Sequence, residues 1–145
     1  MSIAKIRSFN RYYARILGIF DKKFLGMDFS VTEVRILGEI GRNPALTANH
    51  LAVYLGINKG YLSRTLQGLE QQQLIFRIPS ETDGRERYLR LTEQGEILNK
   101  TLEEKADARI RQQIQTMKPE DYQELLAAME KIQQLLAKAI PEITP

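Results

Sequence analysis

The chain has 145 residues, of which 43% are hydrophobic and 27% charged, so it is long enough to bury one sizeable core. It contains no cysteine, which excludes a disulfide framework and cysteine-ligated metal, and a single histidine leaves little for zinc. No apolar run approaches the roughly 18 residues that a membrane span requires. We therefore expect a soluble, cytoplasmic protein without membrane contact, metal or other cofactor.

The net charge of +3 is unevenly distributed along the chain. Residues 1–90 hold 14 basic and 8 acidic side chains, a balance of +6, whereas residues 91–145 hold 7 and 10, a balance of −3. This asymmetry favours a polyanion bound by the front of the chain, and chance clustering is the alternative.

Apolar residues recur at close to helical spacing from Ile3 to Phe24, which predicts a long first helix that ends at Gly26. Ser30 and Glu33 form a capping-box pattern, in which each side chain accepts a hydrogen bond from the other residue's backbone. A second helix is therefore expected to begin after Ser30.

Two further helices follow, joined by a tight turn. Thr47 is placed to cap a short helix that ends at Gly56, and Asn58 is placed to cap the next. The later helix puts three leucines on one face, Leu62, Leu66 and Leu69. Its other face is polar and carries Lys59, Gly60, Tyr61, Ser63, Arg64 and Gln67. A short supporting helix, a glycine turn and a second helix with one apolar face are typical of a helix-turn-helix.

A hairpin is predicted after this helix. Asp83-Gly84 supplies turn chemistry, and alternation beyond it points Tyr88, Arg90 and Thr92 one way and Leu89 and Leu91 the other. Thr92 is also placed to cap a long helix that runs to about Thr116, and Pro119 opens a last helix that ends at Pro141.

The motifs of this region resemble those of the MarR family of bacterial transcription regulators. The similarity is carried by the wing text Asp83-Gly84-Arg85 and the following Leu91-Thr92-Glu93-Gln94-Gly95, together with Leu51-Ala52, Leu55-Gly56, Leu62-Ser63-Arg64 and Leu69-Glu70. The resemblance implies a homodimer with intertwined terminal helices and a palindromic operator on double-stranded DNA.

The expected fold is therefore mainly α, a winged helix-turn-helix with long N- and C-terminal dimerisation helices and a two-stranded wing. We expect a single domain over residues 1–145, with the winged helix-turn-helix at 30–92 and dimerisation helices at 1–25 and 93–140.

A second similarity concerns residues 6–30 and Gly60-Tyr61-Leu62-Ser63-Arg64. These segments resemble the MarR-like half of bacterial proteins that carry a C-terminal acetyltransferase domain. The alternative reading is therefore the N-terminal, DNA-binding-like domain of such a two-domain protein.

The candidate DNA-binding residues lie on the second helix of the helix-turn-helix and on the wing: Lys59, Gly60, Tyr61, Ser63, Arg64, Gln67, Asp83, Arg85 and Arg87. Arginine and glutamine have the donors that suit guanine and adenine edges, and the wing arginine suits a narrow minor groove. Two structural alternatives remain open, because Arg64 could pair with the preceding helices and Tyr61 could pack against the wing. His50 is expected to be a surface residue near phosphates.

A candidate effector site is formed by Tyr12, Tyr13, Arg15 and Arg35. In the family that the chain resembles, small aromatic or anionic compounds often bind between the dimer helices and the winged domain. The alternative for these aromatic residues is ordinary interface core.

An enzyme is not expected, because the sequence has no nucleophile elbow, phosphate loop or metal-ligand spacing. A helical scaffold that binds only protein would leave the basic wing unexplained. The sequence therefore predicts a dimeric DNA-binding regulator, most simply a repressor that a small anionic ligand releases.

Overall fold

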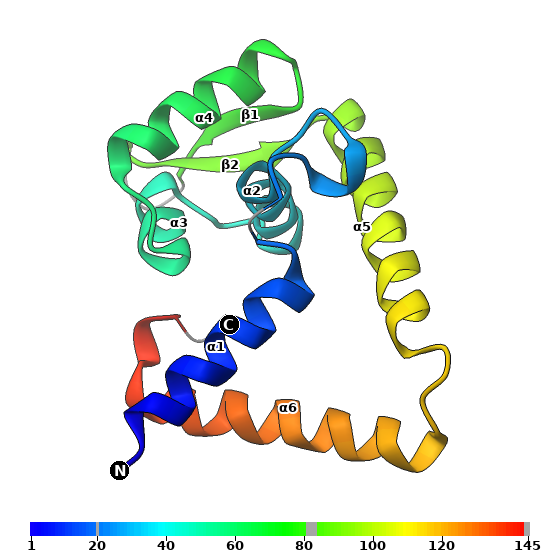
Figure 1. Ribbon diagram of the computed structural model, residues 1–145. Coiled ribbons are helices and arrows are strands. Elements are labelled where there is room, and N and C mark those ends of the chain that lie inside the picture. The colour runs from blue at the N-terminus through cyan, green and yellow to red at the C-terminus, as the bar shows by residue number, and fades with distance from the viewer. Residues whose placement is uncertain (20, 81–83, 144–145) are drawn as a thin grey trace. The chain divides into compact units, whose positions relative to one another are not determined.

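Figure 1 shows a computed structural model of the chain, which describes residues 1–19, 21–80 and 84–143. The chain divides into two compact units, Met1–Arg35 and Ile36–Pro145. The expected single domain over residues 1–145 stays a prediction.

The first helix is shorter than the sequence predicted. Helix α1 spans Ile3–Leu17 and ends at Gly18, whose φ of 67° is left-handed. The Gly18 N–H donates to the Arg15 carbonyl, and the Ile19 N–H donates to the Ala14 carbonyl. This pair of hydrogen bonds is the pattern of a Schellman cap. Apolar spacing alone cannot show such a stop, and the predicted end at Gly26 was wrong. A 3₁₀ turn, η1, follows at Phe24–Gly26.

The capping box is confirmed at the start of α2 (Val31–Arg42). The Ser30 N–H donates to Glu33 Oε1, and the Glu33 N–H donates to Ser30 Oγ, each over 3.1 Å. The next helix, α3 (Ala48–Leu55), begins as predicted at Thr47, whose hydroxyl accepts from the His50 N–H over 3.2 Å.

Helix α4 (Lys59–Gln71) leads directly into a two-stranded antiparallel wing. Strands β1 (Ile75–Pro79) and β2 (Arg87–Leu91) pair in a register that sets Ile75 opposite Leu91 and Pro79 opposite Arg87. The Leu89 N–H donates to the Leu46 carbonyl over 2.8 Å, so β2 also bonds to the segment before α3. The wing therefore follows α4 in the chain and is also hydrogen-bonded to the segment that precedes α3.

Two long helices complete the chain, as predicted. Helix α5 (Glu93–Ile114) has Thr92 as its N-cap, and α6 (Pro119–Ala139) has proline at its first position. Proline suits that position because the first N–H of a helix has no partner within the helix. A short 3₁₀ turn, η2 (Pro141–Ile143), follows.

The core of the unit Ile36–Pro145 is built from aliphatic side chains of α2, the helix-turn-helix, the wing and α5. Its most buried members include Ile36, Leu37, Leu51, Leu62, Leu66, Leu69, Leu89 and Leu102. Burying each such side chain contributes roughly 1.5–3 kcal/mol, so this cluster is the main support of the wing and α4.

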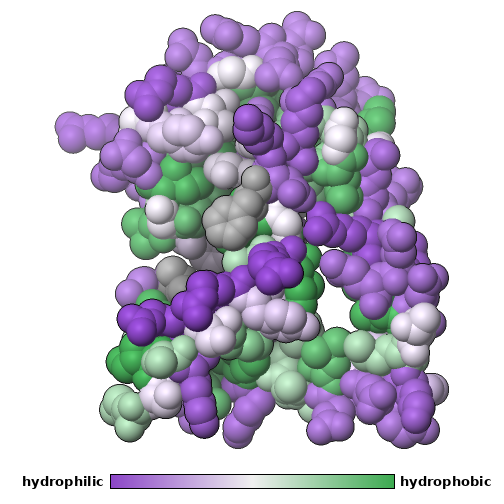
Figure 2. All heavy atoms as spheres, viewed as in Figure 1, coloured by the Kyte–Doolittle hydropathy of each residue, from purple (hydrophilic) through white to green (hydrophobic). Residues whose placement is uncertain are grey.

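The terminal helices are different, because they expose their apolar faces. Within the described residues, α1 and α6 contain no buried position. Large hydrophobic side chains stand exposed along α6, namely Tyr122, Leu126, Met129, Ile132, Leu135 and Leu136. In Figure 2, hydrophobic residues gather along the lower edge of the view, where α6 lies in Figure 1. A contiguous apolar stripe of this size is typical of a surface that packs against another surface.

Candidate nucleic-acid interface

Asn58 caps the first turn of α4. Its Oδ1 accepts from the N–H groups of Gly60 and Tyr61 over 2.9 and 3.2 Å. Before it, Gly56 adopts a left-handed φ of 63°, which ends α3 and turns the chain into α4. Because glycine adopts this conformation at little cost, the turn between the two helices stays short.

The two faces of α4 divide as the sequence predicted. Leu62, Leu66 and Leu69 are at most 2% exposed. The candidate contact residues of this helix are all exposed: Lys59, Gly60, Tyr61, Ser63, Arg64 and Gln67. The structure therefore brings these six together on one accessible helix face.

This face is basic and rich in hydrogen-bond donors. Lys59 and Arg64 lie on it, and no acidic residue occurs between Asn58 and Leu69. Among the described residues, no ion pair involves Arg64, so the alternative of a structural pair with the preceding helices has no support. Tyr61 is 42% exposed, and its carbonyl accepts from the Thr65 hydroxyl. Such a face can donate to phosphate oxygens and to base edges.

The wing presents two arginines near its tip. Arg85 and Arg87 are exposed, on the turn and at the start of β2. The Ser80 N–H donates to the Glu86 carbonyl over 2.9 Å, and the Ser80 hydroxyl lies 3.2 Å from the Tyr88 hydroxyl. These bonds continue the ladder to the edge of the described wing. Asp83, the remaining candidate, lies outside the described residues.

An ion pair that sequence analysis missed ties the wing to α4. Arg77 Nε on β1 donates to Glu70 Oε1 near the end of α4 over 2.8 Å, and both side chains are partly buried. The pair spans seven residues and crosses from helix to strand. Only its opposite charges, on either side of the predicted helix end, could have indicated it.

Family comparison agrees with this geometry. The sequence profile described as the MarR family matches residues 26–86, the span from η1 through the wing turn. The HTH-type transcriptional regulator PetP of Rhodobacter capsulatus is 32% identical over 105 residues, which cover 70% of this chain and 63% of PetP. Residues 26–86 thus carry a MarR-family domain. The chain aligns with less than two thirds of the length of PetP.

Solved structures share the fold of this chain. Streptococcus pneumoniae FabT in complex with DNA has a TM-score of 0.75 at 23% identity, covering 94% of this chain and 98% of FabT. The S. aureus MepR–DNA complex has a TM-score of 0.67 at 21% identity, covering 91% and 96%. Wild-type E. coli MarR has a TM-score of 0.72 at 18% identity, covering 91% and 97%. At these identities the likeness establishes the fold.

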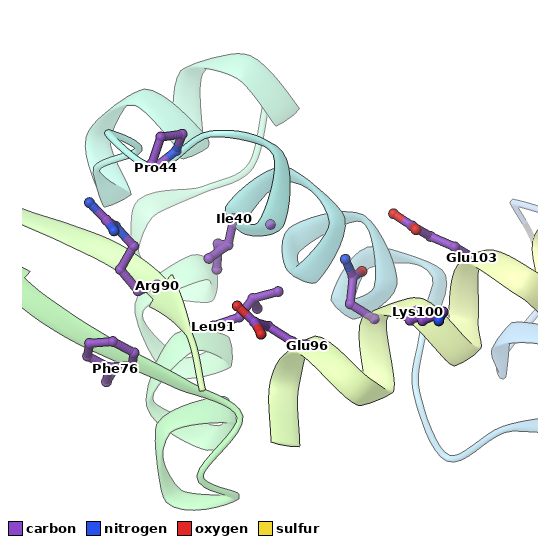
Figure 3. A pocket seen from close by; sticks show the side chains of 10 residues that line it. Ile40, Pro44, Phe76, Arg90, Leu91, Glu96, Lys100 and Glu103 are labelled. Atoms are coloured by element: carbon purple, nitrogen blue, oxygen red, sulfur yellow. The ribbon is translucent and has the colours of Figure 1, made fainter. Parts of the chain in front are cut away.

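A hollow of about 500 Å³ lies elsewhere on the unit Ile36–Pro145, between the end of α2, the wing strands and α5 (Figure 3). Its apolar lining includes Ile40, Pro44, Phe76 and Leu91. Its charged lining is balanced, with Arg90 and Lys100 against Glu96 and Glu103. A balanced lining does not favour a polyanion, so the exposed face of α4 is the better DNA candidate in this MarR-family fold.

The four candidate effector residues all lie in the unit Met1–Arg35. Tyr12 and Arg15 are exposed on α1, and Arg35 is exposed on α2. Tyr13 is half-buried and stacks on Phe9 with ring centroids 5.6 Å apart. This stack is what a packed helix face would also show, so the effector assignment remains a prediction.

Among residues 1–19, 21–80 and 84–143, no group of three or more histidine, cysteine or acidic side chains is arranged to hold a metal ion. No helix within those residues is long and apolar enough to cross a membrane.

Proposed function

We propose that the chain is a homodimeric, sequence-specific DNA-binding transcription regulator. The observation that carries this proposal is the exposed, donor-rich face of α4, fixed beside an arginine-bearing wing. FabT and MepR, which share the fold, have been solved with DNA, and this supports the same partner here. Repression of a pseudo-palindromic operator is the simplest activity of such a regulator.

The side chains of α4 would divide between anchoring and reading. An α-helix fits the major groove of B-DNA, where bidentate contacts pair arginine with guanine and glutamine with adenine. We assign Arg64 and Gln67 to base edges. Lys59, Ser63 and the backbone at Gly60 would anchor phosphates, with Tyr61 against sugar or a thymine methyl group.

The wing would add a contact in the adjacent minor groove. A narrow minor groove has enhanced negative potential, which attracts a guanidinium. Arg85 is assigned to this groove and Arg87 to the neighbouring backbone.

A dimer is supported by the uncovered faces of the terminal helices. The apolar stripe of α6, and the exposed Ile3, Ile6 and Phe9 of α1, are surfaces that a partner chain would cover. A closed two-fold dimer would cover identical stripes and present two copies of α4. Release by a small aromatic or anionic effector is part of the proposal, through Tyr12, Tyr13, Arg15 and Arg35.

An acetyltransferase-linked role is the second candidate, and neither the family profile nor the relatives described above support it. Nor does either give reason to expect an enzyme. We therefore retain the regulator as the proposed function.

Selection of bound duplexes from a random DNA pool tests the proposal. We expect enrichment of a site with two-fold symmetry by the purified chain. The Arg64→Ala, Gln67→Ala double variant serves as the control and should lose that base preference. Enrichment by neither protein would overturn DNA binding, and an enriched site without symmetry would overturn the dimer.

A further inference from the structure

The base of the wing is joined to α5 through one hydroxyl. Thr92 Oγ1 donates to the carbonyl of Gln73 over 2.6 Å and accepts from the Gly95 N–H over 3.0 Å. A threonine hydroxyl has one proton to donate and lone pairs to accept with, so the two bonds are compatible. The first bond reaches back to Gln73, two residues beyond the end of α4, and the second caps α5.

The residues around this hydroxyl leave little room for movement. The Thr92 N–H donates to the Leu74 carbonyl, and the Leu74 N–H donates to the Leu69 carbonyl within α4, each over 3.0 Å. A Cβ added to Gly95 would overlap the Leu74 carbonyl oxygen, so the first turn of α5 lies directly against that peptide.

Gln73 itself has a left-handed φ of 60°. A non-glycine residue in this region carries strain that the surroundings must hold, and the Thr92 bond to its carbonyl is placed to do so. In Figure 1, α4 ends and α5 begins at the same end of the hairpin.

We propose that Thr92 is a positioning residue, which sets the direction of α4 relative to α5 and thereby the spacing of DNA half-sites. The inference rests on the proposed function, since it requires a dimer that binds a two-fold site. In that dimer α5 would connect each α4 to the terminal helices, so the angle at Thr92 would control how far apart the two copies of α4 lie.

The length of α5 makes this angle matter. Its 22 residues span roughly 33 Å at about 1.5 Å per residue. A tilt of about 10° at one end therefore displaces the other by roughly 6 Å. One base pair corresponds to about 3.4 Å along the duplex and roughly one tenth of a turn. A variable angle between α4 and α5 would thus allow binding to half-sites at several spacings, whereas a fixed angle would allow only one.

Substitutions at Thr92 can separate its two bonds. Thr92→Asp keeps an acceptor for the Gly95 N–H, because aspartate is a good N-cap, but its carboxylate cannot donate to the Gln73 carbonyl. Thr92→Ser keeps both bonds and is the matched control. Thr92→Ala loses both.

The test measures affinity for three duplexes by fluorescence anisotropy at fixed salt. The first is the two-fold duplex that the wild-type chain selects from a random pool, and the others have half-sites moved one base pair closer or farther. For wild type and Thr92→Ser we expect a loss on the order of tenfold at either altered spacing. For Thr92→Asp and Thr92→Ala the loss should fall below about threefold, with weaker binding to the selected duplex.

A purely structural role for Thr92 would lower the melting temperature without changing preference among spacings. Folded Thr92→Asp and Thr92→Ala proteins with the wild-type spacing profile would therefore overturn the inference. Failure of the wild-type chain to select any two-fold duplex would instead overturn the proposed function.

The angle between α4 and α5 can also be tested in the absence of DNA. Because the chain has no cysteine, nitroxides can be attached at Gln71→Cys on α4 and Lys105→Cys on α5, both exposed positions. Labelled chains diluted into unlabelled chains report the distance within one chain by pulsed electron resonance. The distribution should broaden in Thr92→Asp and stay narrow in Thr92→Ser. Equal widths would contradict a role for the Gln73 bond in fixing the angle.

Discussion

Arg85 is the residue through which the wing can be tested apart from folding. Its side chain is exposed, so Arg85→Ala should change the free energy of unfolding by no more than about 0.5 kcal/mol. Loss of a minor-groove guanidinium should weaken operator binding by roughly 1–3 kcal/mol. Arg85→Lys should restore part of that loss, because an ammonium keeps the charge but is more strongly hydrated.

Fluorescence anisotropy and thermal melts on the same samples would separate the two effects. Lys105→Ala, which removes a charge from an exposed position of α5, is the control for net charge. Wild-type affinity in folded Arg85→Ala protein would remove the wing arginine from the mechanism and leave α4 as the reader.

Substitutions of Asn58, the N-cap of α4, can also separate stability from DNA affinity. Its Oδ1 accepts two backbone N–H groups, and aspartate would accept them at least as well beside the positive end of the helix. Asn58→Asp should therefore match or exceed wild-type stability, whereas Asn58→Ala should lose about 0.5–2 kcal/mol.

DNA affinity should follow the opposite order for these two variants. A carboxylate at this position would repel phosphates that approach the first turn of α4, so Asn58→Asp should bind more weakly than Asn58→Ala once both are folded. Chemical denaturation and anisotropy titrations give the two rankings. Undiminished binding by Asn58→Asp would show that the start of α4 stays away from the DNA backbone.

At the scale of elements, the close packing of α5 against the peptide of Leu74 requires a glycine at position 95. Gly95→Ala would drive a methyl group into the Leu74 carbonyl, and should cost roughly 1–3 kcal/mol, the range for overpacked sites. Gly68→Ala is the matched control, because nothing lies within 4 Å of its added Cβ in α4. That change should stabilise the protein by about 0.5–1 kcal/mol. Urea denaturation of both variants checks the opposite signs, and equal effects would contradict the close packing at Gly95.

Most elements were predictable because their ends carry local chemistry. Ser30, Thr47, Asn58 and Thr92 cap helices in the structure as the sequence indicated. The end of α1 was not predictable from apolar spacing, because the pattern continues past Gly18 while the backbone turns there.

The exposure of the candidate site on α4 was also predictable. The exposed face of α4 follows from three leucines at spacings of four and three, and the structure places it as expected. The Glu70–Arg77 pair and the Thr92–Gln73 bond were not foreseen, because each joins residues whose proximity depends on how the hairpin folds back. Sequence identified Thr92 as a helix cap but not as the donor to the Gln73 carbonyl.

For the whole molecule, the uncovered face of α6 is the feature to test. Leu125→Asp with Met129→Asp places two charges on the apolar stripe and should give a monomer or an unfolded chain, because burying unpaired charges is costly. Gln123→Asp with Gln134→Asp adds the same charge on the opposite face of the helix and should leave the dimer intact. Light scattering gives the mass, and a monomeric wild-type chain at micromolar concentration would contradict the proposed dimer.

The separation of the two faces of α4 also bears on how the protein can evolve. The leucines of α4 are no more than 2% exposed and pack in the core, while Arg64 and Gln67 are exposed to solvent. Substitutions at such exposed positions usually change stability by less than about 0.5 kcal/mol. The side chains assigned to bases can thus be exchanged while the scaffold stays folded, so a duplicated gene could acquire a new target sequence without first acquiring a more stable protein.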